Sequence, residues 1–544
     1  MPHHTAPEVE VCVSTWWQRG VIYQVYPRSF SDSDGDGIGD LRGITSRIDH
    51  LVELGVDALW ISPIYPSPMA DFGYDVADYC DVDPRFGALA DFDILLAAAH
   101  ERGLKVILDF VPNHSSDQHP WFLESRSSRT DPRRDWYVWR DPAPGGGPPN
   151  NWISDFGGSA WEWDEATGQY YLHAFLKEQP DLSWRNPDVQ RAMYDVLRFW
   201  LARGVDGFRI DVLWHLVKAE GLPDNPPNPH HQASKGEMDR VLQLHSTDQP
   251  EVHGIAGEMR RIADGFGDRV LIGEIYLPLD RLVRYYGVEA PGVHLPFNFQ
   301  LVGAPWKADV LAGLIAAYEA ALPAGAWPNW VLGNHDRARI ATRVGEAQAR
   351  VAAMLLLTLR GTPTLYYGDE LGLTDVAIPP ALVQDPRELR EPGLGLGRDP
   401  VRTPMPWDDT PGAGFTTGTP WLPLGADWRT RNVARQRTEP RSMLTLHRQL
   451  LALRRRHPAL ALGDLTLLET TPPDVLAYER RQDDARVLVV LNLGARSREV
   501  VLPAWAHAAQ VLLSTLDAPA APRGGLLVLR PDEGSVLGSP TAAS

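Results

Sequence analysis

The residues Gly207-Phe208-Arg209-Ile210-Asp211-Val212-Leu213 form a short apolar run that carries two opposite charges. The run follows the amphipathic stretch Val189–Arg203, so we predict a buried strand that comes directly after a helix. Arg209 and Asp211 are two positions apart, and on an extended strand their side chains leave the same face. A guanidinium beside a carboxylate keeps it ionised, as a carboxylate nucleophile requires. A buried structural ion pair would give the same pattern.

Further β-rich runs alternate with amphipathic stretches along the chain, and this alternation predicts a parallel sheet covered by helices. Seven visible runs and one obscured run favour an α/β fold of the (β/α)8 TIM-barrel type over an open sheet. The runs are Val21–Tyr26, Ala58–Ile64, Lys105–Val111, Gly207–Val212, Val270–Ile275, Asn329–Gly333 and Thr364–Tyr367. The predicted helices include Leu41–Leu54, Asp91–Arg102, Val189–Arg203 and Ala347–Leu359.

Two regions interrupt the alternation. Residues 113–184 are rich in Trp, Pro, Gly and Asp, which predicts an inserted subdomain after the third strand. Beyond about residue 455 the runs are β-type only, which predicts a separate antiparallel sheet or β-sandwich. The small, polar residues Gly534–Ser544 are expected to be disordered. We therefore expect a barrel from 1–112 and 185–455, an inserted domain over 113–184 and a C-terminal domain over 456–544.

Composition excludes several classes of partner. The net charge of −18 argues against nucleic acid or an anionic membrane as a partner. No apolar run approaches a membrane span, and the N-terminus lacks the pattern of a secretory signal. Cys12 and Cys80 are the only cysteines among 544 residues, so no disulfide framework is expected. These features together predict a cytoplasmic protein.

Polar side chains occupy the C-terminal ends of several predicted strands, the rim at which barrel enzymes hold their active sites. The third strand ends in Asp109-Phe-Val-Pro-Asn113-His114, the fifth in Gly273-Glu274, and the sixth runs into Asn334-His335-Asp336. A single carboxylate in such a place is often the N-cap of the next helix. Several carboxylates on one rim repel one another and destabilise the fold, so such a group is expected where function requires it.

Two of these carboxylates suffice to cleave a glycosidic bond, because an ionised one can attack the anomeric carbon while a protonated one donates to the leaving oxygen. Asp211, beside Arg209, suits the nucleophile. Glu274 lies in an apolar strand with no basic residue adjacent in sequence, which suits the acid/base. Asp336 is expected to bind sugar hydroxyls as positive charge develops. His114 and His335 lie at strand ends and are suited to hydrogen bonds with the same hydroxyls. A structural role is the more common one for a histidine.

These segments resemble, in order, the four signature regions of the α-amylase superfamily, glycoside hydrolase family 13: residues 109–114, 207–211, 273–274 and 334–336. Gln179-Pro-Asp-Leu182 is similar to a fifth region in the form typical of the oligo-1,6-glucosidase and α-glucosidase branch. Three further stretches resemble that branch: 21–28 (VIYQVYPR), 71–75 and 402–408. The resemblance covers roughly residues 16–410 and implies a (β/α)8 catalytic domain, an inserted B domain and a C-terminal β-sandwich.

The resemblance also implies a retaining double displacement, with Asp211 as nucleophile, Glu274 as acid/base and Asp336 as transition-state stabiliser. The positions that match residues around the terminal glucose are Asp71, Tyr74, His114, Arg209, His335 and Arg402. Asp71 and Arg402 are expected to pair and to close the far end of the cleft, which would make the enzyme exo-acting. The positions that match residues lining the entrance are Phe156, Phe175 and Gln179.

A separate motif, Asp32-Ser-Asp34-Gly-Asp36-Gly-Ile38-Gly-Asp40, places oxygen ligands at every second position in a glycine-rich loop, as sites for hard cations do. It is not a full EF-hand, since the twelfth position is Gly43. The similar loop of the family implies a structural Ca²⁺ or Mg²⁺ held by these carboxylates and the Ile38 carbonyl. An acidic turn without a metal is the alternative. No organic cofactor is expected.

The predicted function is a retaining, exo-acting α-glucosidase that releases glucose from the non-reducing end of short, maltose-type α-glucosides, with transglucosylation onto sugar or alcohol acceptors. Val212 after the nucleophile accompanies tolerance of α-1,6 bonds in similar sequences, but it does not settle linkage preference. Oligo-1,6-glucosidase, sucrose hydrolase and trehalose synthase are alternatives on the same scaffold. A non-catalytic amylase-like binding protein is disfavoured because all three carboxylates are present.

Overall fold

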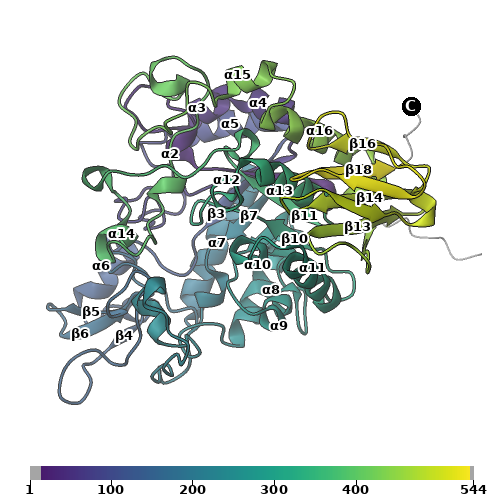
Figure 1. Ribbon diagram of the computed structural model, residues 1–544. Coiled ribbons are helices and arrows are strands. Elements are labelled where there is room, and N and C mark those ends of the chain that lie inside the picture. The colour runs from purple at the N-terminus through teal and green to yellow at the C-terminus, as the bar shows by residue number, and fades with distance from the viewer. Residues whose placement is uncertain (1–13, 539–544) are drawn as a thin grey trace, which may run out of the picture.

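The protein is described by a computed structural model over residues 14–538, and its centre is a sheet of eight parallel strands (Figure 1). The strands follow one another in the order β10-β11-β1-β2-β3-β7-β8-β9. This arrangement confirms the prediction of a (β/α)8 fold. The strands are β1 (Ile22–Val25), β2 (Ala58–Ile61), β3 (Lys105–Phe110), β7 (Gly207–Ile210), β8 (Val270–Gly273), β9 (Leu295–Pro296), β10 (Asn329–Val331) and β11 (Thr362–Tyr366).

The strand that the sequence obscured is β9, which is only two residues long. It contains Pro296, which cannot donate a hydrogen bond to a neighbouring strand, so the segment carries little strand signal. β9 pairs with β8 through Leu295 and Pro296.

Helices between the strands cover the outside of the sheet. They are α3 (Leu41–Ser46), α4 (Ile48–Leu54), α5 (Leu89–Glu101), α7 (Pro187–Arg203), α8 (Glu251–Asp264), α9 (Leu279–Leu282), α10 (Gln300–Gly303), α11 (Ala308–Ala321), α12 (Ile340–Val344), α13 (Glu346–Thr358) and α16 (Met443–Arg456). The predicted single helix over 41–54 is wrong, because the chain leaves helical geometry at Arg47, where φ is −108° and ψ is 4°.

The connection between α7 and β7 shows how local sequence positions the strand that precedes Asp211. Asn186 caps the first turn by accepting from the Asp188 N–H, and Gly204 ends the helix in the left-handed conformation at φ 109°. Three residues later β7 begins at Gly207, where a Cβ atom would lie 2.3 Å from the Val270 carbonyl oxygen of β8. Glycine therefore allows β7 and β8 to approach closely, and these two strands carry Asp211 and Glu274.

The insertion after β3 folds around a small antiparallel sheet of order β4-β6-β5. Its elements are α6 (Pro120–Ser127), β4 (Trp139–Arg140), β5 (Trp161–Asp164) and β6 (Gln169–Leu172). Phe122, Trp139 and Tyr171 pack their rings against one another beneath it. In Figure 1 the sheet β4-β6-β5 projects from the barrel on the side away from the C-terminal strands.

The C-terminal region forms a five-stranded antiparallel sheet, β12-β13-β14-β18-β16, and a two-stranded sheet, β15-β17. Its strands are β12 (Asp464–Leu467), β13 (Val475–Gln482), β14 (Ala485–Asn492), β15 (Arg498–Val501), β16 (Gln510–Ser514), β17 (Leu526–Leu529) and β18 (Gly534–Gly538). The prediction that residues 534–538 are disordered is wrong: β18 is buried between β14 and β16. Residues 539–544 and Cys12 lie outside the described residues.

Over residues 14–538, none of the helices combines the length and the apolar character that crossing a bilayer requires.

Candidate active site

One guanidinium gathers three carboxylates at the carboxyl-terminal ends of β3, β7 and β8. The Nη1 atom of Arg209 lies 2.7 Å from Asp109 Oδ1 and 2.6 Å from Asp211 Oδ1. Its Nη2 atom lies 2.7 Å from Glu274 Oε2. Glu274 has no basic residue beside it in sequence, yet it has one in space, because β7 and β8 are neighbours and Arg209 contacts the acids that follow both strands.

Strand register sets the spacing of Asp211 and Glu274. Ile210 of β7 pairs with Gly273 of β8, so the two acids are the next residues on adjacent strands. Neighbouring strands lie about 4.8 Å apart. A retaining glycosidase needs its two carboxyl groups about 5–5.5 Å apart. The register therefore places the two acids side by side on neighbouring chain segments, and the separation of their carboxyl groups is set by their side chains.

The backbone turns sharply after Asp211. Val212 has φ 35° and ψ 47°, a left-handed conformation that a β-branched residue rarely adopts. The turn directs the Val212 N–H to Glu274 Oε2 at 2.9 Å. Backbone strain of this kind persists only where surrounding contacts enforce it, and here it fixes one acid relative to the other.

Burial raises the pKa of both Asp211 and Glu274, and repulsion between neighbouring carboxylates adds to it, while Arg209 acts in the opposite direction. Both side chains are over nine-tenths buried. The two carboxyl groups therefore keep a proton to higher pH than usual, and their titration belongs to the pair and not to either residue. One ionised and one protonated carboxyl group is the state that acid-assisted nucleophilic attack requires.

Asp336 differs from this pair because two arginines and an imidazole ring lie beside it. Its Oδ1 lies 2.8 Å from Arg402 Nη2 and 3.5 Å from Arg398 Nη1, and its Oδ2 lies 3.4 Å from His335 Nε2. Burial alone would raise the pKa of Asp336, but His335, Arg402 and Arg398 outweigh it and hold the pKa well below the ordinary value. Asp336 is thus an ionised carboxylate at neutral pH.

The expected pairing of Asp71 with Arg402 is wrong. Asp71 Oδ1 instead lies 2.6 Å from Arg398 Nη2, and Arg402 is engaged with Asp336. Arg398 also contacts Asp385 Oδ1 at 2.7 Å, so it links three carboxylates. Arg398 lies closer to Asp71 than Arg402 does. Arg398 therefore binds Asp71, and Arg402 binds Asp336.

Tyr74 and His335 form a stacked pair beside the acids. Their rings are 2° from parallel with centroids 5.5 Å apart, and the Tyr74 hydroxyl lies 2.7 Å from His335 Nε2. Tyr74 also donates to Asp109 Oδ2 at 3.1 Å. Burial lowers the pKa of His335 to about 3, so the ring is neutral at physiological pH.

The three residues predicted to line the entrance lie together, beside His114 and Asp71. Gln179 Nε2 is 3.1 Å from His114 Nε2 and 3.3 Å from Asp71 Oδ2. The Phe175 ring lies 5.1 Å from the His114 ring, and Phe156 packs on Phe175 at 6.4 Å. The insertion thus supplies one wall, next to residues from the barrel strands.

Three of the five predicted metal ligands come together in the loop after β1. Asp32, Asp34 and Asp40 each offer an oxygen, and these oxygens lie within 4.8 Å of one another. Asp36 is not part of this group: its carboxylate accepts from the Ile38 N–H at 2.7 Å. The group is an all-oxygen, acidic set of the kind that Ca²⁺ or Mg²⁺ takes.

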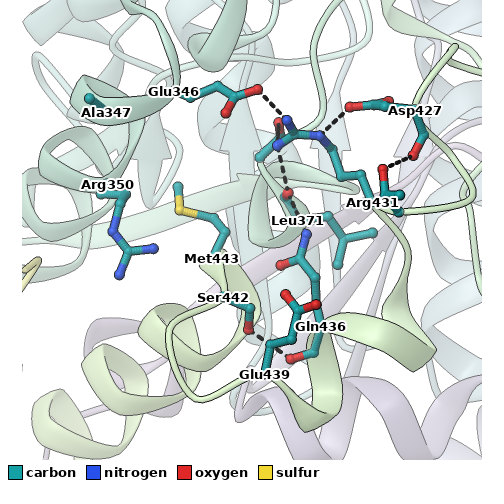
Figure 2. A pocket seen from close by; sticks show the side chains of 12 residues that line it. Glu346, Ala347, Arg350, Leu371, Asp427, Arg431, Gln436, Glu439, Ser442 and Met443 are labelled. Atoms are coloured by element: carbon teal, nitrogen blue, oxygen red, sulfur yellow. Dashed lines mark hydrogen bonds and ion pairs between the residues drawn. The ribbon is translucent and has the colours of Figure 1, made fainter.

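A cavity of about 400 Å³ lies away from this site, between the start of α13 and the segment from Asp427 to Met443 (Figure 2). Arg431 in its wall pairs with Asp427 at 2.6 Å and with Glu346. Gln436 donates to the Leu371 carbonyl at 2.9 Å. These side chains pair with one another and with the backbone. The cavity is therefore part of the packing between chain segments and not a catalytic site.

Sequence reasoning missed Arg398 and Asp385 as members of the site. Both belong to the long connection after β11, whose length hides where its side chains fall. The available signal was the position of Arg398, four residues before the motif that begins at Arg402.

A barrel whose carboxyl-terminal rim holds such an acid pair has the architecture of a glycoside hydrolase. Residues 24–463 match the family described as alpha amylase, catalytic domain, and residues 465–531 match the maltogenic amylase C-terminal domain. The chain belongs to the alpha-amylase family.

Named relatives cover nearly the whole chain. A probable alpha-glucosidase of Rhizobium meliloti is 42% identical over 505 residues, 90% of this chain and 91% of the relative. An oligo-1,6-glucosidase of Parageobacillus thermoglucosidasius is 37% identical over 560 residues, 96% and 98% of the two chains.

Two solved structures have the same fold over nearly all of this chain. An alpha-glucosyl transfer enzyme, XgtA, superposes with a TM-score of 0.92 at 42% identity, covering 97% of this chain and all of the other. A variant of the trehalulose synthase MutB in complex with its substrate sucrose superposes with a TM-score of 0.89 at 37% identity, covering 96% of this chain and 99% of the other.

Proposed function

We propose that the protein is a retaining α-glucosidase in which Asp211 attacks the anomeric carbon, Glu274 donates a proton to the leaving oxygen, and Asp336 stabilises the positive charge of the transition state. The observation that carries this proposal is the sharing of Arg209 by Asp211 and Glu274. Water that enters after the leaving group departs is deprotonated by Glu274 and releases glucose. A sugar or alcohol in place of water gives transglucosylation.

Exo-action is supported by the residues beyond the acids. Arg398 ties Asp71 to Asp385, and Arg402 ties Asp336 to the His335 carbonyl at 2.8 Å. These ion pairs support a site that is closed beyond the acids, and a site closed there would accept only a chain end. The substrates are therefore short α-glucosides with a free non-reducing glucose.

Stereochemistry and nucleophile replacement test the assignment. Proton NMR of an aryl α-glucoside digest is expected to show α-glucose first, before mutarotation. Asp211→Ala is expected to lower kcat by at least about 10⁴-fold, the size of effect seen on removing a covalent nucleophile. Glu274→Gln should cost less with an activated aryl leaving group than with maltose, since such a group needs little protonation. Initial release of β-glucose, or turnover by Asp211→Ala near the parental rate, would refute the proposal.

Substrate preference is tested by products from maltose, isomaltose, sucrose and trehalose. We expect the highest kcat/KM on maltose. Isomaltose and sucrose are the two main alternative substrates. Relatives named oligo-1,6-glucosidase support isomaltose, and a structural neighbour described with sucrose as its substrate supports sucrose. Faster hydrolysis of isomaltose, or formation of a sucrose isomer, would reassign the linkage while leaving the catalytic roles intact.

We also propose that the loop after β1 holds a structural Ca²⁺ or Mg²⁺ through Asp32, Asp34 and Asp40. Their converging oxygens support it, since three carboxylates this close repel one another without a cation. When bound, the metal stiffens the loop and takes no part in the reaction. Calorimetric titration of chelator-treated protein should show one site per chain, which Asp34→Asn should weaken; no binding would refute the site.

A further inference from the structure

Arg337 is an exposed arginine that directly follows Asp336 in the segment after β10. Its guanidinium carbon lies over the ring of Tyr276, 5.0 Å from the ring centre, and Tyr276 is two residues beyond Glu274. The Tyr276 ring stacks in turn on Phe299, 9° from parallel with centroids 4.1 Å apart. A cation over an aromatic face is attracted to it. Arg337 is therefore positioned by aromatic packing although it is open to solvent.

This arginine lies close to the proposed acid/base and the proposed stabiliser. Tyr276 contributes most to a raised pKa of Arg337, and Asp336 and Glu274 add to it, so the guanidinium is within electrostatic reach of both acids. Trp214, in the turn after β7, meets the Tyr276 ring edge-on at 5.7 Å. In the proposed reaction Glu274 protonates the leaving oxygen, so the leaving group lies beside Glu274 and the acceptor later takes the same place.

Arg337 differs from the other arginines of the site in its lack of a carboxylate partner. Arg209, Arg398 and Arg402 each contact a carboxylate at 2.8 Å or less. Within residues 14–538, no carboxylate lies at ion-pair distance from the Arg337 guanidinium. Burial lowers the pKa of Arg387, and the charges of Arg398 and Arg337 lower it further, so these guanidinium groups lie near one another. Positive charge thus gathers beside the acids, and Arg337 is the member without a carboxylate.

The chemistry of a guanidinium decides which ligand suits it. It has five N–H donors in one plane and no acceptor, and it can bind a carboxylate through two parallel hydrogen bonds. Such charge-assisted bonds are roughly twice as strong as bonds between neutral groups. A sugar hydroxyl would use one donor and leave the charge without a partner. A carboxylate therefore fits Arg337 better than a neutral sugar does.

We propose that Arg337 is a specificity-determining residue that binds a carboxylate on the leaving group or acceptor, so the preferred acceptors carry both a hydroxyl and a carboxylate. The inference rests on the proposed function, because it takes the leaving group to lie beside Glu274. In transfer, the acceptor hydroxyl oxygen bonds to the anomeric carbon of the glucosyl ester, Glu274 takes the hydroxyl proton, and the bond to Asp211 breaks. The acceptor carboxylate is unchanged.

Two aryl α-glucosides that differ only in the para substituent test the inference: 4-carboxyphenyl and 4-carbamoylphenyl α-glucoside. The carbamoyl group has nearly the size of the carboxylate but no charge. The readout is the ratio of kcat/KM on the two substrates, for the parent, Arg337→Gln and Arg337→Lys. Comparing ratios between proteins cancels the different acidities of the two leaving groups. Arg429→Gln is the matched control, since Arg429 is also exposed and lies 4.1 Å over the Trp428 ring, without a carboxylate partner in residues 14–538.

We expect the carboxyl-to-carbamoyl ratio to fall about 10–100-fold in Arg337→Gln, the factor that a charge-assisted hydrogen bond provides. Arg337→Lys should fall less, since lysine keeps the charge but loses the two-point contact. Arg429→Gln should keep the parental ratio. An unchanged ratio in Arg337→Gln, or an equal fall in Arg429→Gln, would overturn the inference while hydrolysis of the carbamoyl substrate upholds the proposed function. Hydrolysis of neither glucoside by the parent would overturn both.

Acceptor choice gives a second readout. With 4-nitrophenyl α-glucoside as donor, 4-(hydroxymethyl)benzoate and 4-(hydroxymethyl)benzamide would compete as acceptors in one mixture. We expect the parent to form more of the carboxylate-bearing glucoside, and Arg337→Gln to lose that preference. A parental preference for the neutral acceptor, or a preference for the carboxylate that survives in Arg337→Gln, would refute the assignment of Arg337.

Discussion

Arg209→Lys is the substitution that tests the electrostatics of the site most sharply. Arg209 makes three contacts of 2.6–2.7 Å, with Asp109, Asp211 and Glu274, through two terminal nitrogens. Lysine keeps the charge but has a single point of contact, so it cannot span carboxylates on both β7 and β8. At least one of the two proposed catalytic acids, Asp211 and Glu274, loses its cation contact.

The size of the effect follows from those contacts. A hydrogen bond to a charged group contributes about 1.5–3 kcal/mol, and one pKa unit corresponds to about 1.4 kcal/mol. Arg209 favours the ionised forms of Asp211 and Glu274, so weakening it raises the pKa of the pair further above the ordinary range. Asp211, the proposed nucleophile, then ionises only at higher pH. We expect the acidic limb of kcat/KM to move up by about 1–2 pH units.

The assay is the pH dependence of kcat/KM on an aryl α-glucoside, with thermal unfolding followed at each pH. Arg454→Lys is the matched control, because Arg454 is equally buried but donates to carbonyl oxygens, including Gly361 at 2.6 Å, and to no carboxylate. It should lower stability without moving the limb. An acidic limb that stays in place or moves down in Arg209→Lys would refute the reasoning.

Three further substitutions have defined outcomes. Asp211→Asn should abolish turnover yet raise the melting temperature at pH 7.5 by about 1–2 °C, because burial raises the pKa of Asp211 and its ionised form destabilises the fold above the unfolded pKa. That gain should vanish below about pH 4, where both states are protonated, and a lower melting temperature at pH 7.5 would contradict it. Arg398→Met leaves Asp71 and Asp385 without their cation. It should lower the unfolding free energy by about 3–5 kcal/mol and remove most of the activity. A stability loss under about 1 kcal/mol in urea titration would show that the ion pairs contribute little. Gly207→Ala places a Cβ against the Val270 carbonyl and should destabilise the protein by about 1–3 kcal/mol, whereas unchanged denaturant midpoints would mean that β7 and β8 can separate at little cost.

The sequence alone predicted the barrel and the candidate catalytic acids. Strand and helix periodicities are local, so β7, β8 and the helix α7 could be predicted from their own residues. Asp211 and Glu274 each follow a strand, and parallel strands in one sheet bring their carboxyl ends to one rim whatever the loops do. The family followed from the same ordered motifs.

Elements with little local signal were missed. β9 is two residues with a proline. β18 is a five-residue stretch in which three residues are Gly or Ser, and it becomes a strand only because β14 and β16 lie on either side of it. Neighbours supply their backbone partners and their burial, and neither can be read from the segment itself.

Only the tertiary structure decided which charges meet. Asp71 and Arg398 are 327 positions apart, and nothing in the spacing distinguishes Arg398 from Arg402 as the partner of Asp71. Arg209 serves Glu274 as well as Asp211 because strand pairing places Ile210 beside Gly273. Periodicity along the chain reports which face a side chain occupies, whereas a long-range ion pair depends on distances through space that only the packing of strands and loops establishes.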